Sequence, residues 1–213
     1  MKTPLNPLIP SRAPKRAHFD AETIYPILDE ALFCTISYTI DHQPYTIPTS
    51  FVRYGNKIYI HGSVGSHFIR TLEKGLPVCI CVMLADSLVV AKSALSHSVN
   101  YRSVVLFASA EVIADPQVKL ESFEWLIDKV VPGSWDYLRP ITESEIRRTA
   151  VLAFDLSESS AKIRQGMPSD EAADKALPIW SGIIPLNTQR MRPIADESSQ
   201  QIKLPEHLAS IGV

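Results

Sequence analysis

The chain has 213 residues, of which 46% are hydrophobic, and its 21 Lys and Arg residues nearly balance its 23 Asp and Glu residues. This length and composition predict a single domain with a full hydrophobic core. The balanced charge excludes the strong positive field that recruits nucleic acid or an anionic membrane surface. No apolar run approaches the roughly 20 residues of a membrane span, and the N-terminus lacks the apolar segment of a signal peptide, so we expect a cytoplasmic protein.

The first segment, residues 1–16, is rich in proline and has no periodicity, so it predicts an extended arm. Asp20 is a candidate N-cap for a helix that ends near Ala31, and the β-branched and aromatic run 31–40 predicts the first strand. Two further strand-like runs, residues 46–54 and 57–61, flank Gly55-Asn56, a dipeptide typical of a tight hairpin.

The middle of the chain continues the strand pattern. Residues 77–83 and 87–92 predict two neighbouring buried strands joined by a turn, and residues 93–100 predict a polar connection without regular structure. A long strand is then expected over residues 104–113. The cysteines Cys34, Cys79 and Cys81 lie in apolar runs without a CxxC frame, which predicts reduced thiols in the core and no metal site.

Asp115-Pro116 is a cap signature for a helix that ends before Pro132-Gly133, and we expect this helix to cover one mouth of a barrel. Thr142 and Glu145 form a candidate capping box for a short helix, followed by a strand over residues 150–156. Such closely spaced strands with few helices predict a mainly β fold with flanking helices and a closed antiparallel sheet. No GxGxxG follows a strand, which argues against a Rossmann domain.

One stretch carries an argument about chemistry. The small-residue loop 62–66 leads from a predicted strand into an amphipathic helix near Phe68. The free N–H groups of a first helical turn, the helix dipole and the serine hydroxyls would converge with His67 and Arg70 on one phosphate. A plain N-cap role for Ser66 explains the same pattern, and that alternative stays open.

Several segments resemble the pyridoxamine 5′-phosphate oxidase-related family of FMN-binding split barrels. They are Pro48-Thr49-Ser50, Tyr59-Ile60-His61-Gly62, Gly65-Ser66-His67 and Asn100-Tyr101-Arg102-Ser103-Val104. Two later segments, residues 160–166 and 180–186, resemble the nitroimidazole-reductase-like branch of that family. The resemblance implies a six- to seven-stranded antiparallel FMN-binding split barrel over residues 17–186, between the N-terminal arm 1–16 and a C-terminal tail 187–213. It also implies a homodimer with flavin at the subunit interface, and the tail is expected to be loose or wrapped across a neighbour.

The resemblance implies a set of cofactor-binding residues in addition to Arg70. They are Pro48, Thr49, Ser50 and Phe51 along the flavin edge; His61 and Gly62 near the ribityl chain; Ser66 and His67 at the phosphate; Tyr101, Arg102 and Ser103 at the flavin; Lys162 and Arg164 near N1 and O2; and Trp180 over the flavin or the dimer seam.

Simpler structural roles remain open for these residues. His67 stands where family members usually have Arg or Lys, and it is alternatively a surface histidine whose missing charge Arg70 replaces. His61 is alternatively an ordinary strand residue, and Trp180 a core residue. The segment 101–103 could serve cross-strand packing, and the two later cations could be solvated.

The function that the resemblance implies is an FMN-dependent oxidoreductase that acts on a small organic molecule through hydride transfer at flavin N5. No catalytic residue is assigned. The alternative is a non-catalytic flavin- or haem-binding module for sensing or storage, with His18, His42, His97 and His207 available as iron ligands. A third possibility is an inert dimeric scaffold with an empty groove.

Overall fold

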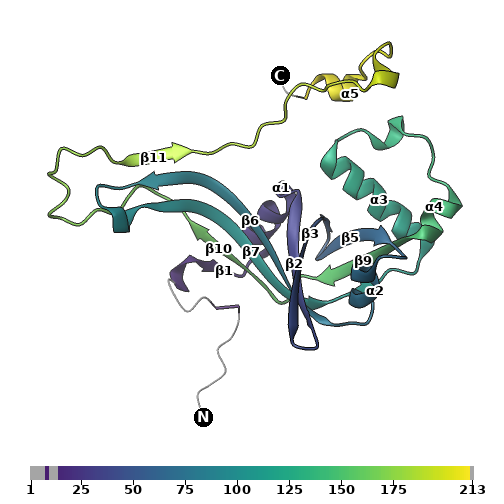
Figure 1. Cartoon of the computed structure of the whole chain (residues 1–213), viewed down its shortest axis with the longest axis horizontal. Coiled ribbons are helices and arrows are strands. Elements are labelled where there is room, and N and C mark those ends of the chain that lie inside the picture. The colour runs from purple at the N-terminus through teal and green to yellow at the C-terminus, as the bar shows by residue number, and fades with distance from the viewer. Residues whose placement is uncertain (1–7, 10–13, 212–213) are drawn as a thin grey trace.

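The computed structural model describes residues 8–9 and 14–211 and shows a β-rich body with a long arm on one side and a helical lobe on the other (Figure 1). Most of the predicted N-terminal arm, residues 1–16, lies outside the described residues. No helix in the described ranges is long and apolar enough to cross a membrane.

The predicted first helix is confirmed as α1 (Ala21–Glu30). The Asp20 side chain accepts a hydrogen bond from the Thr23 backbone N–H at 2.8 Å, which satisfies one donor of the first turn. A short 3-10 turn η1 (Pro14–Arg16) and strand β1 (Ala17–His18) precede it. The apolar face of α1 enters the core through Ile24, Ile27 and Leu28.

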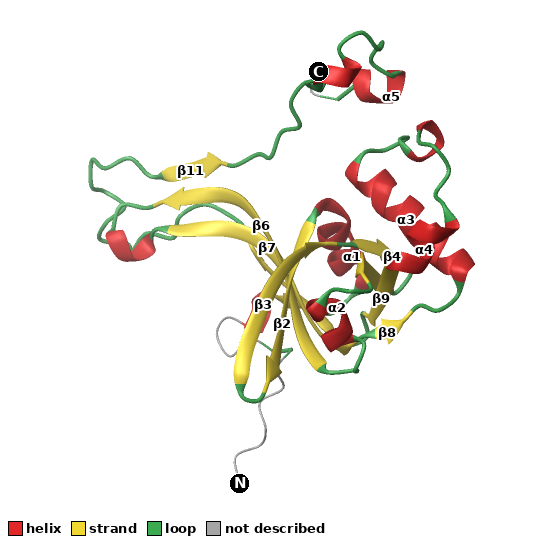
Figure 2. Cartoon of the chain, turned by 45° about the vertical axis from the view of Figure 1, so that its right-hand side comes forward, coloured by secondary structure: helices red, strands yellow, loops and turns green. Residues whose placement is uncertain are grey.

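Two antiparallel sheets form the body (Figure 2). The larger, sheet A, has the order β1-β10-β7-β6-β2-β3, and β11 pairs with β6. Its longer strands are β2 (Phe33–Ile40), β3 (Gln43–Ser50), β6 (Pro77–Val90), β7 (Ser98–Ser109), β10 (Ser159–Arg164) and β11 (Gly182–Pro185). The smaller, sheet B, has the order β4-β5-β9-β8, with β4 (Val52–Tyr54), β5 (Lys57–Ser63), β8 (Glu111–Val112) and β9 (Thr149–Asp155). The predicted mainly β antiparallel fold is therefore confirmed.

The strand boundaries differ from the sequence prediction at four places. The strand expected over 104–113 is divided at Ala110 between β7 of sheet A and β8 of sheet B. The run 46–54 is broken at Phe51, where the chain passes from sheet A to sheet B. The two strands expected over 77–92 are one strand, β6, with a bulge between Ala85 and Ser87. The segment 93–100 contains a 3-10 turn, η2 (Ala94–Ser96), and the first residues of β7, because β6 and β7 pair as a long hairpin. Pairing with a neighbour thus extends strands into polar sequence.

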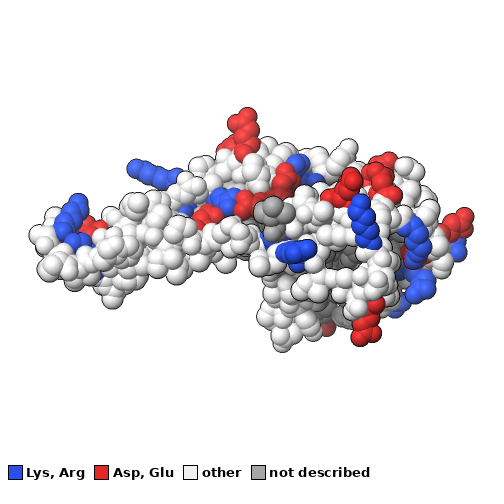
Figure 3. Space-filling view, turned by 90° about the horizontal axis from the view of Figure 1, so that it is seen from above, with Lys and Arg blue, Asp and Glu red and all other residues white. Residues whose placement is uncertain are grey.

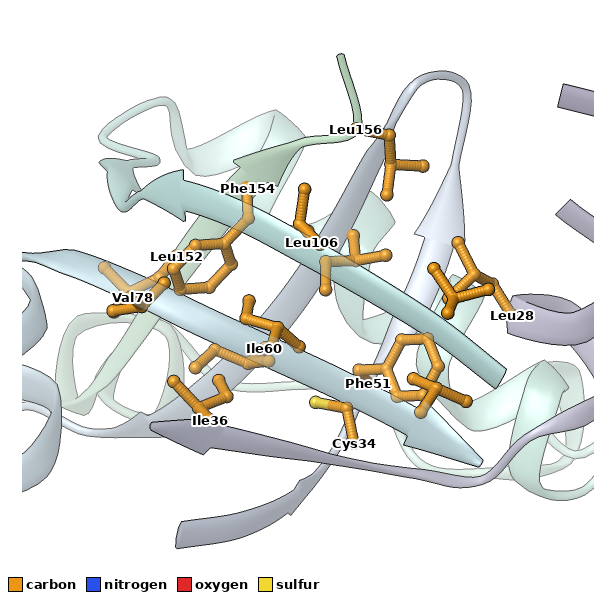
Figure 4. Close-up of a cluster of buried hydrophobic side chains, with 14 of the residues drawn as sticks. Leu28, Cys34, Ile36, Phe51, Ile60, Val78, Leu106, Leu152, Phe154 and Leu156 are labelled. Carbon is orange, nitrogen blue, oxygen red and sulfur yellow. The ribbon is translucent and has the colours of Figure 1, made fainter. Parts of the chain in front are cut away.

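The main hydrophobic core lies between the inner faces of the two sheets and is closed by α1 (Figure 4). Its fully buried side chains include Ile36 from sheet A, Phe154 from sheet B, and Phe51 at the junction between them. The same alternation along each strand assigns the remaining side chains to the outer faces of the sheets.

The outer face of sheet B is covered by the helical lobe, which comprises α3 (Pro116–Val130), η3 (Trp135–Tyr137) and α4 (Glu143–Arg148). A second cluster forms there, where Phe123 and Leu126 of α3 pack on Tyr59 and Val151. The prediction that this helix covers a barrel mouth is wrong, because its apolar stripe lies on the face of a sheet. The predicted capping box at Thr142 and Glu145 is present.

Within residues 8–9 and 14–211, no helical layer covers the outer face of sheet A in the same way. Phe33 is 64% exposed and Met83 is 66% exposed on this face. The prediction that the cysteines are core thiols holds for Cys34 and is wrong for Cys81, which is exposed, while Cys79 is half-buried. Both alternate with the buried Val78, Ile80 and Val82 along β6, so they point away from the core.

The β6–β7 hairpin and β11 form the arm, which presents mostly uncharged surface (Figure 3). From β11 the tail runs back toward the helical lobe (Figure 1), where η4 (Glu197–Ser199) and α5 (Glu206–Ala209) follow. His207 bonds Ser134 at 3.1 Å and packs against Tyr137, with ring centroids 5.4 Å apart. The described part of the tail is therefore docked on its own chain at this point.

Candidate functional site

The loop between β5 and α2 (His67–Leu72) is a tight turn that leads directly into the helix. The Ser66 backbone N–H donates to the Ser63 carbonyl at 2.9 Å, and the Gly65 N–H donates to the Ser63 hydroxyl at 3.2 Å. The Val64 N–H donates to the Arg148 carbonyl at 3.0 Å, which ties the loop to the end of α4. The loop is thus held by its own contacts.

The first-turn donors of α2 remain available. The first helical bond runs from the Arg70 N–H to the Ser66 carbonyl, so the N–H groups of His67, Phe68 and Ile69 have no partner among the described residues. The Ser66 side chain makes no cap hydrogen bond. The alternative of Ser66 as a plain side-chain cap is therefore not what the structure shows.

Arg70 brings a positive charge to this loop. Its Nε donates to the Val64 carbonyl at 2.9 Å, which holds the guanidinium beside the turn. His67 is exposed at the first position of the helix. An anion at this position would meet three amide donors, one hydroxyl and one fixed cation, which is the chemistry of a phosphate site.

Gly62 sets how closely α2 approaches sheet B. A Cβ at this position would lie 2.7 Å from Cγ1 of Ile69, whose side chain is buried. Only glycine permits this close approach without a shift of the helix. Gly62 therefore shapes the predicted phosphate loop through packing.

Six of the predicted flavin residues share the outer face of sheet A. Pro48 lies in one row with Thr35, Cys81 and Val105, since these residues pair across β3, β2, β6 and β7. The alternation of side chains places Ser50, Tyr101 and Ser103 on the same face, together with Lys162 and Arg164, which pair with Ser103 and Tyr101. This face therefore combines hydroxyl groups, exposed apolar side chains such as Phe33 and Met83, and two cations on β10.

Three predicted residues point elsewhere. Thr49 alternates with Pro48 and Ser50 and so lies on the inner face, and the Phe51 side chain is fully buried. Arg102 is held by Glu30 of α1 and Asp86 of β6 in three-way ion pairs at 2.5 and 2.7 Å. The hydrogen bonds that Arg102 donates to these carboxylates raise its pKa, and the two carboxylates compensate its charge, so its side chain serves the fold.

Arg164 is partly engaged in a polar cluster at the base of the arm. Its guanidinium donates to the Asn100 side-chain oxygen. The Asn100 amide in turn donates to the Ser87 hydroxyl at 2.8 Å and to the Gly166 carbonyl at 3.0 Å. Asn100 and Ser87 are buried, so the cluster fixes where β10 leaves the sheet.

Trp180 lies on the arm side, just before β11, and 65% of its surface is exposed. Its ring packs against Gly182, where a Cβ would lie 2.9 Å from the indole. The alternative of a core tryptophan is therefore excluded, and the indole is available to cover a ligand or a second subunit.

His61 is adjacent to Gly62 in sequence but faces the helical lobe. It pairs with Val151 across sheet B and meets the Phe123 ring edge-on at a centroid distance of 6.0 Å. It lines a cavity of about 770 Å³ between β5, α3 and the η3–α4 segment. The surrounding wall partly desolvates the imidazole and lowers its pKa, which favours the neutral form, although one side stays open to solvent. The structure thus separates His61 from the outer face of sheet A.

A sequence model of the family described as Pyridoxamine 5′-phosphate oxidase matches residues 20–163. The chain belongs to this family. The sequence resemblance is therefore confirmed, and the two sheets are the halves of its split barrel.

Two solved structures of the family are similar over nearly the whole chain. The flavocytochrome Anf3 from Azotobacter vinelandii is 35% identical, with 95% of this chain and 94% of that chain covered and a TM-score of 0.88. A FAD and haem binding protein from Mycobacterium smegmatis is 32% identical, with 92% and 97% covered and a TM-score of 0.88. A candidate 5-nitroimidazole antibiotic resistance protein from Bacteroides thetaiotaomicron, 20% identical over 69% of this chain and 86% of that chain, shares the fold with a TM-score of 0.59. Among curated protein sequences, none matches this chain.

The sequence did not predict the residues that line the cavity beside His61. Trp135, Leu138 and Ile141 lie in the Pro-containing connection between two predicted helices, where the sequence pattern indicates only the end of one helix and the start of the next. Three large apolar side chains in such a connection are a signal of burial that helical periodicity does not capture. Arg139, at the rim of the cavity, had no signal in the sequence.

Proposed function

We propose that this chain binds a flavin nucleotide and acts, as a homodimer, as an oxidoreductase on a small organic molecule. The observation that carries the proposal is the β5–α2 loop. Three backbone N–H groups there have no partner among the described residues, and together with the Ser66 hydroxyl and Arg70 they could bind a phosphate. Two relatives above 30% identity, a flavocytochrome and a FAD and haem binding protein, support the assignment.

The resemblance in the sequence implies FMN, whereas the Mycobacterium smegmatis relative is described as binding FAD. Both flavins carry a phosphate on the ribityl chain, and the loop offers hydrogen-bond donors and positive charge to that group in either case. Comparison of the two affinities decides which flavin the chain takes.

The protein residues supply position and charge. Arg70 would hold the phosphate end, and the outer face of sheet A offers the Ser50 hydroxyl as a donor. The Ser103 hydroxyl already donates to the Lys162 carbonyl at 3.2 Å and offers only an acceptor. Lys162 of β10 would supply positive charge on this face, which would favour an anionic reduced ring. When bound, the flavin itself supplies the hydride and electron transfer chemistry.

A second copy of the chain is the proposed cover for the outer face of sheet A. Phe33 and Met83 are exposed there, and the neighbouring arm presents mostly uncharged surface (Figure 3). A contiguous exposed apolar surface of this kind is typical of a subunit interface. Free thiols at Cys34, Cys79 and Cys81 fit a reducing compartment, and we place the protein in the cytoplasm.

The test for cofactor binding is the thermal unfolding midpoint of the flavin-free protein with added FAD, FMN or neither. A ligand specific for the folded state raises the midpoint with increasing concentration. We expect a rise with at least one flavin, and a colourless protein whose midpoint moves with neither would refute the proposal.

The test for the dimer is sedimentation of the wild type and of the double variant Phe33→Glu/Met83→Glu. Two charges on the outer face of sheet A would oppose burial against a second copy. We expect a dimer for the wild type and a monomer for the variant. A monomeric wild type, or a variant that stays dimeric, would exclude this face as the interface.

A further inference from the structure

The C-terminal tail runs back from β11 on the arm to the helical lobe (Figure 1). We propose that residues 187–211 form a strap that holds η3 in place, so that release of the strap widens the entrance to the cavity between sheet B and the helical lobe. The proposal goes beyond the proposed function, because this cavity lies on the outer face of sheet B and the flavin is proposed on sheet A. It therefore does not depend on flavin binding.

The end of the strap is seated on the turn that joins α3 to η3. The Nε2 atom of His207 and the Ser134 hydroxyl are hydrogen-bonded at 3.1 Å, and the His207 ring packs against Tyr137 with the ring centroids 5.4 Å apart. A Cβ at Gly133 would lie only 3.2 Å from the His207 Cβ, so His207 also approaches the backbone of the turn closely. His207 thus occupies a socket formed by residues 133–137.

A second contact of the strap lies at the C-terminal end of α3. The Arg190 guanidinium donates to the Lys129 carbonyl at 3.4 Å. Lys129 is in the last turn of α3, where carbonyl groups lack a helical partner and the helix dipole favours a cation. This hydrogen bond is long, so we expect His207 to contribute most of the attachment.

The rest of the strap is exposed. Met191 is 75% exposed and Ile194 is 96% exposed. Among the described residues, those from 191 to 205 form hydrogen bonds only within the strap itself. A segment that is held by few contacts opens at a low cost in free energy. The strap can therefore detach while the two sheets stay folded.

The short turn η3 couples the strap to the cavity. Ser134 and Tyr137 contact the strap, whereas Trp135 and Asp136 between them line the cavity. A single turn of 3-10 helix has little stability of its own, so its neighbours keep it in place. Release of His207 would free one side of η3, and Trp135 would then no longer be fixed in the cavity wall.

The wall beyond η3 stays anchored when the strap is released. Arg139 pairs with Glu145 of α4 at 2.6 and 2.9 Å, and this pair does not involve the strap. Movement of the wall is therefore confined to the η3 side of the entrance.

The cavity behind this wall suits an apolar, aromatic molecule. Its volume of about 770 Å³ falls within the range of roughly 300–1,000 Å³ typical of ligand pockets. Apolar side chains such as Phe123, Leu126 and Leu138 form much of the lining. An aromatic molecule would bury its surface against them, and the position of η3 would set how quickly it enters.

The first test is hydrogen–deuterium exchange of the full chain, read by mass spectrometry, for the wild type and for His207→Ala/Arg190→Ala. The N–H groups of Ser134, Tyr137 and Leu138 donate to backbone carbonyls in or beside η3. We expect these amides to exchange about tenfold faster in the variant, with unchanged exchange in β5 and β9.

His97→Ala/Arg192→Ala is the matched control, because it removes the same two residue types from exposed positions away from the lobe, and it should exchange as the wild type does. Equal exchange of η3 in the strap variant and the wild type would overturn the proposal. Faster exchange in β5 and β9 as well would also overturn it, since the strap would then support the whole fold.

The second test follows the entry of 1-anilinonaphthalene-8-sulfonate by stopped-flow fluorescence, because this dye brightens when it binds apolar surface. We expect the strap variant to bind the dye severalfold faster than the wild type and the control. Ile141→Trp, added to the strap variant, fills part of the cavity and should remove this gain. An unchanged rate of dye binding in the strap variant, or a gain that persists with Ile141→Trp, would show that the strap does not control this cavity.

Discussion

The outer faces of the two sheets of the barrel differ in how well they are covered. The outer face of sheet B is closed by α3, which packs Phe123 and Leu126 on the strands, whereas the outer face of sheet A leaves Phe33 and Met83 in solvent. One face is thus completed within the chain and encloses a cavity against its own helices. The other stays open among the described residues, and it is the face on which we propose the flavin and a second subunit.

The prediction with the largest expected effect tests whether side chains on the two outer faces contribute differently to the free energy of unfolding. Phe123→Ala removes a buried ring between α3 and sheet B and should cost about 3–5 kcal/mol of unfolding free energy. Phe33→Ala, the matched change on the exposed face, should cost less than about 0.5 kcal/mol in a single subunit. Urea unfolding measures both. Equal losses of unfolding free energy from both variants at all protein concentrations would contradict the difference between the two faces. A loss from Phe33→Ala that grows with protein concentration would indicate that this side chain is buried against a second subunit.

The second prediction concerns the join between α2 and sheet B. Gly62→Ala places a Cβ 2.7 Å from Ile69 Cγ1, a buried group that cannot move freely. We expect a loss of about 1–3 kcal/mol in urea unfolding, with weaker flavin binding because α2 is displaced. Gly65→Ala is the control, since its Cβ would meet nothing closer than the Ser63 hydroxyl at 3.6 Å. Equal unfolding free energies for both variants would show that the close approach of α2 to Gly62 does not contribute to stability.

The third prediction uses Lys129, which links the helical lobe to the sheet junction. Its Nζ donates to the Leu28 carbonyl at 2.8 Å and lies 3.7 Å from the centroid of the Phe51 ring. Burial lowers the pKa of Lys129 to about 8, below its ordinary value of 10.5. Above pH 8 the unfolded chain therefore binds more protons than the folded one, and stability rises with pH.

The rise due to Lys129 should be about 1 kcal/mol between pH 8 and 9. Above pH 9 Cys34 opposes it, because burial raises the pKa of this thiol to about 12 and the folded state retains its proton. Lys129→Met should abolish the rise between pH 8 and 9 in urea unfolding. A variant with the same pH slope as the wild type would rule out a buried, partly neutral lysine.

The smallest expected effect tests the charge at the phosphate loop. His67→Arg restores the cation that the family usually has there and adds a full positive charge at the start of α2. Flavin affinity should rise about two- to fivefold, and the gain should shrink with added salt. His97→Arg adds the same charge on the arm and should leave affinity unchanged. Equal gains from both variants would indicate only a general charge effect.

Local signals in the sequence predicted much of the fold. The Asp20 cap, the Gly55-Asn56 hairpin and the capping box of α4 are all present, because each depends on residues close together in the chain. Strand β10 was not predicted, since its polar side chains became buried only through pairing with β7 and β1. Long-range pairing of this kind leaves no local pattern.

The candidate site was predictable to a smaller extent. Alternation along β6 correctly put Cys79 and Cys81 on one face but could not say which face the core would cover. The loop 62–70 was found from its residue types, whereas the direction of His61 depends on the side of sheet B that α3 occupies. The partners of Arg102, Glu30 and Asp86, come from α1 and β6, so sequence order alone gave no hint of them.

The most direct measurement is an equilibrium titration of FAD, FMN and riboflavin into the wild type and into the double variant Ser66→Ala/Arg70→Ala. The phosphate contacts of the β5–α2 loop predict that the variant loses affinity for FAD and FMN, by roughly tenfold or more, while its weaker affinity for riboflavin stays the same. Equal losses for riboflavin and the phosphorylated flavins would contradict a phosphate site at this loop.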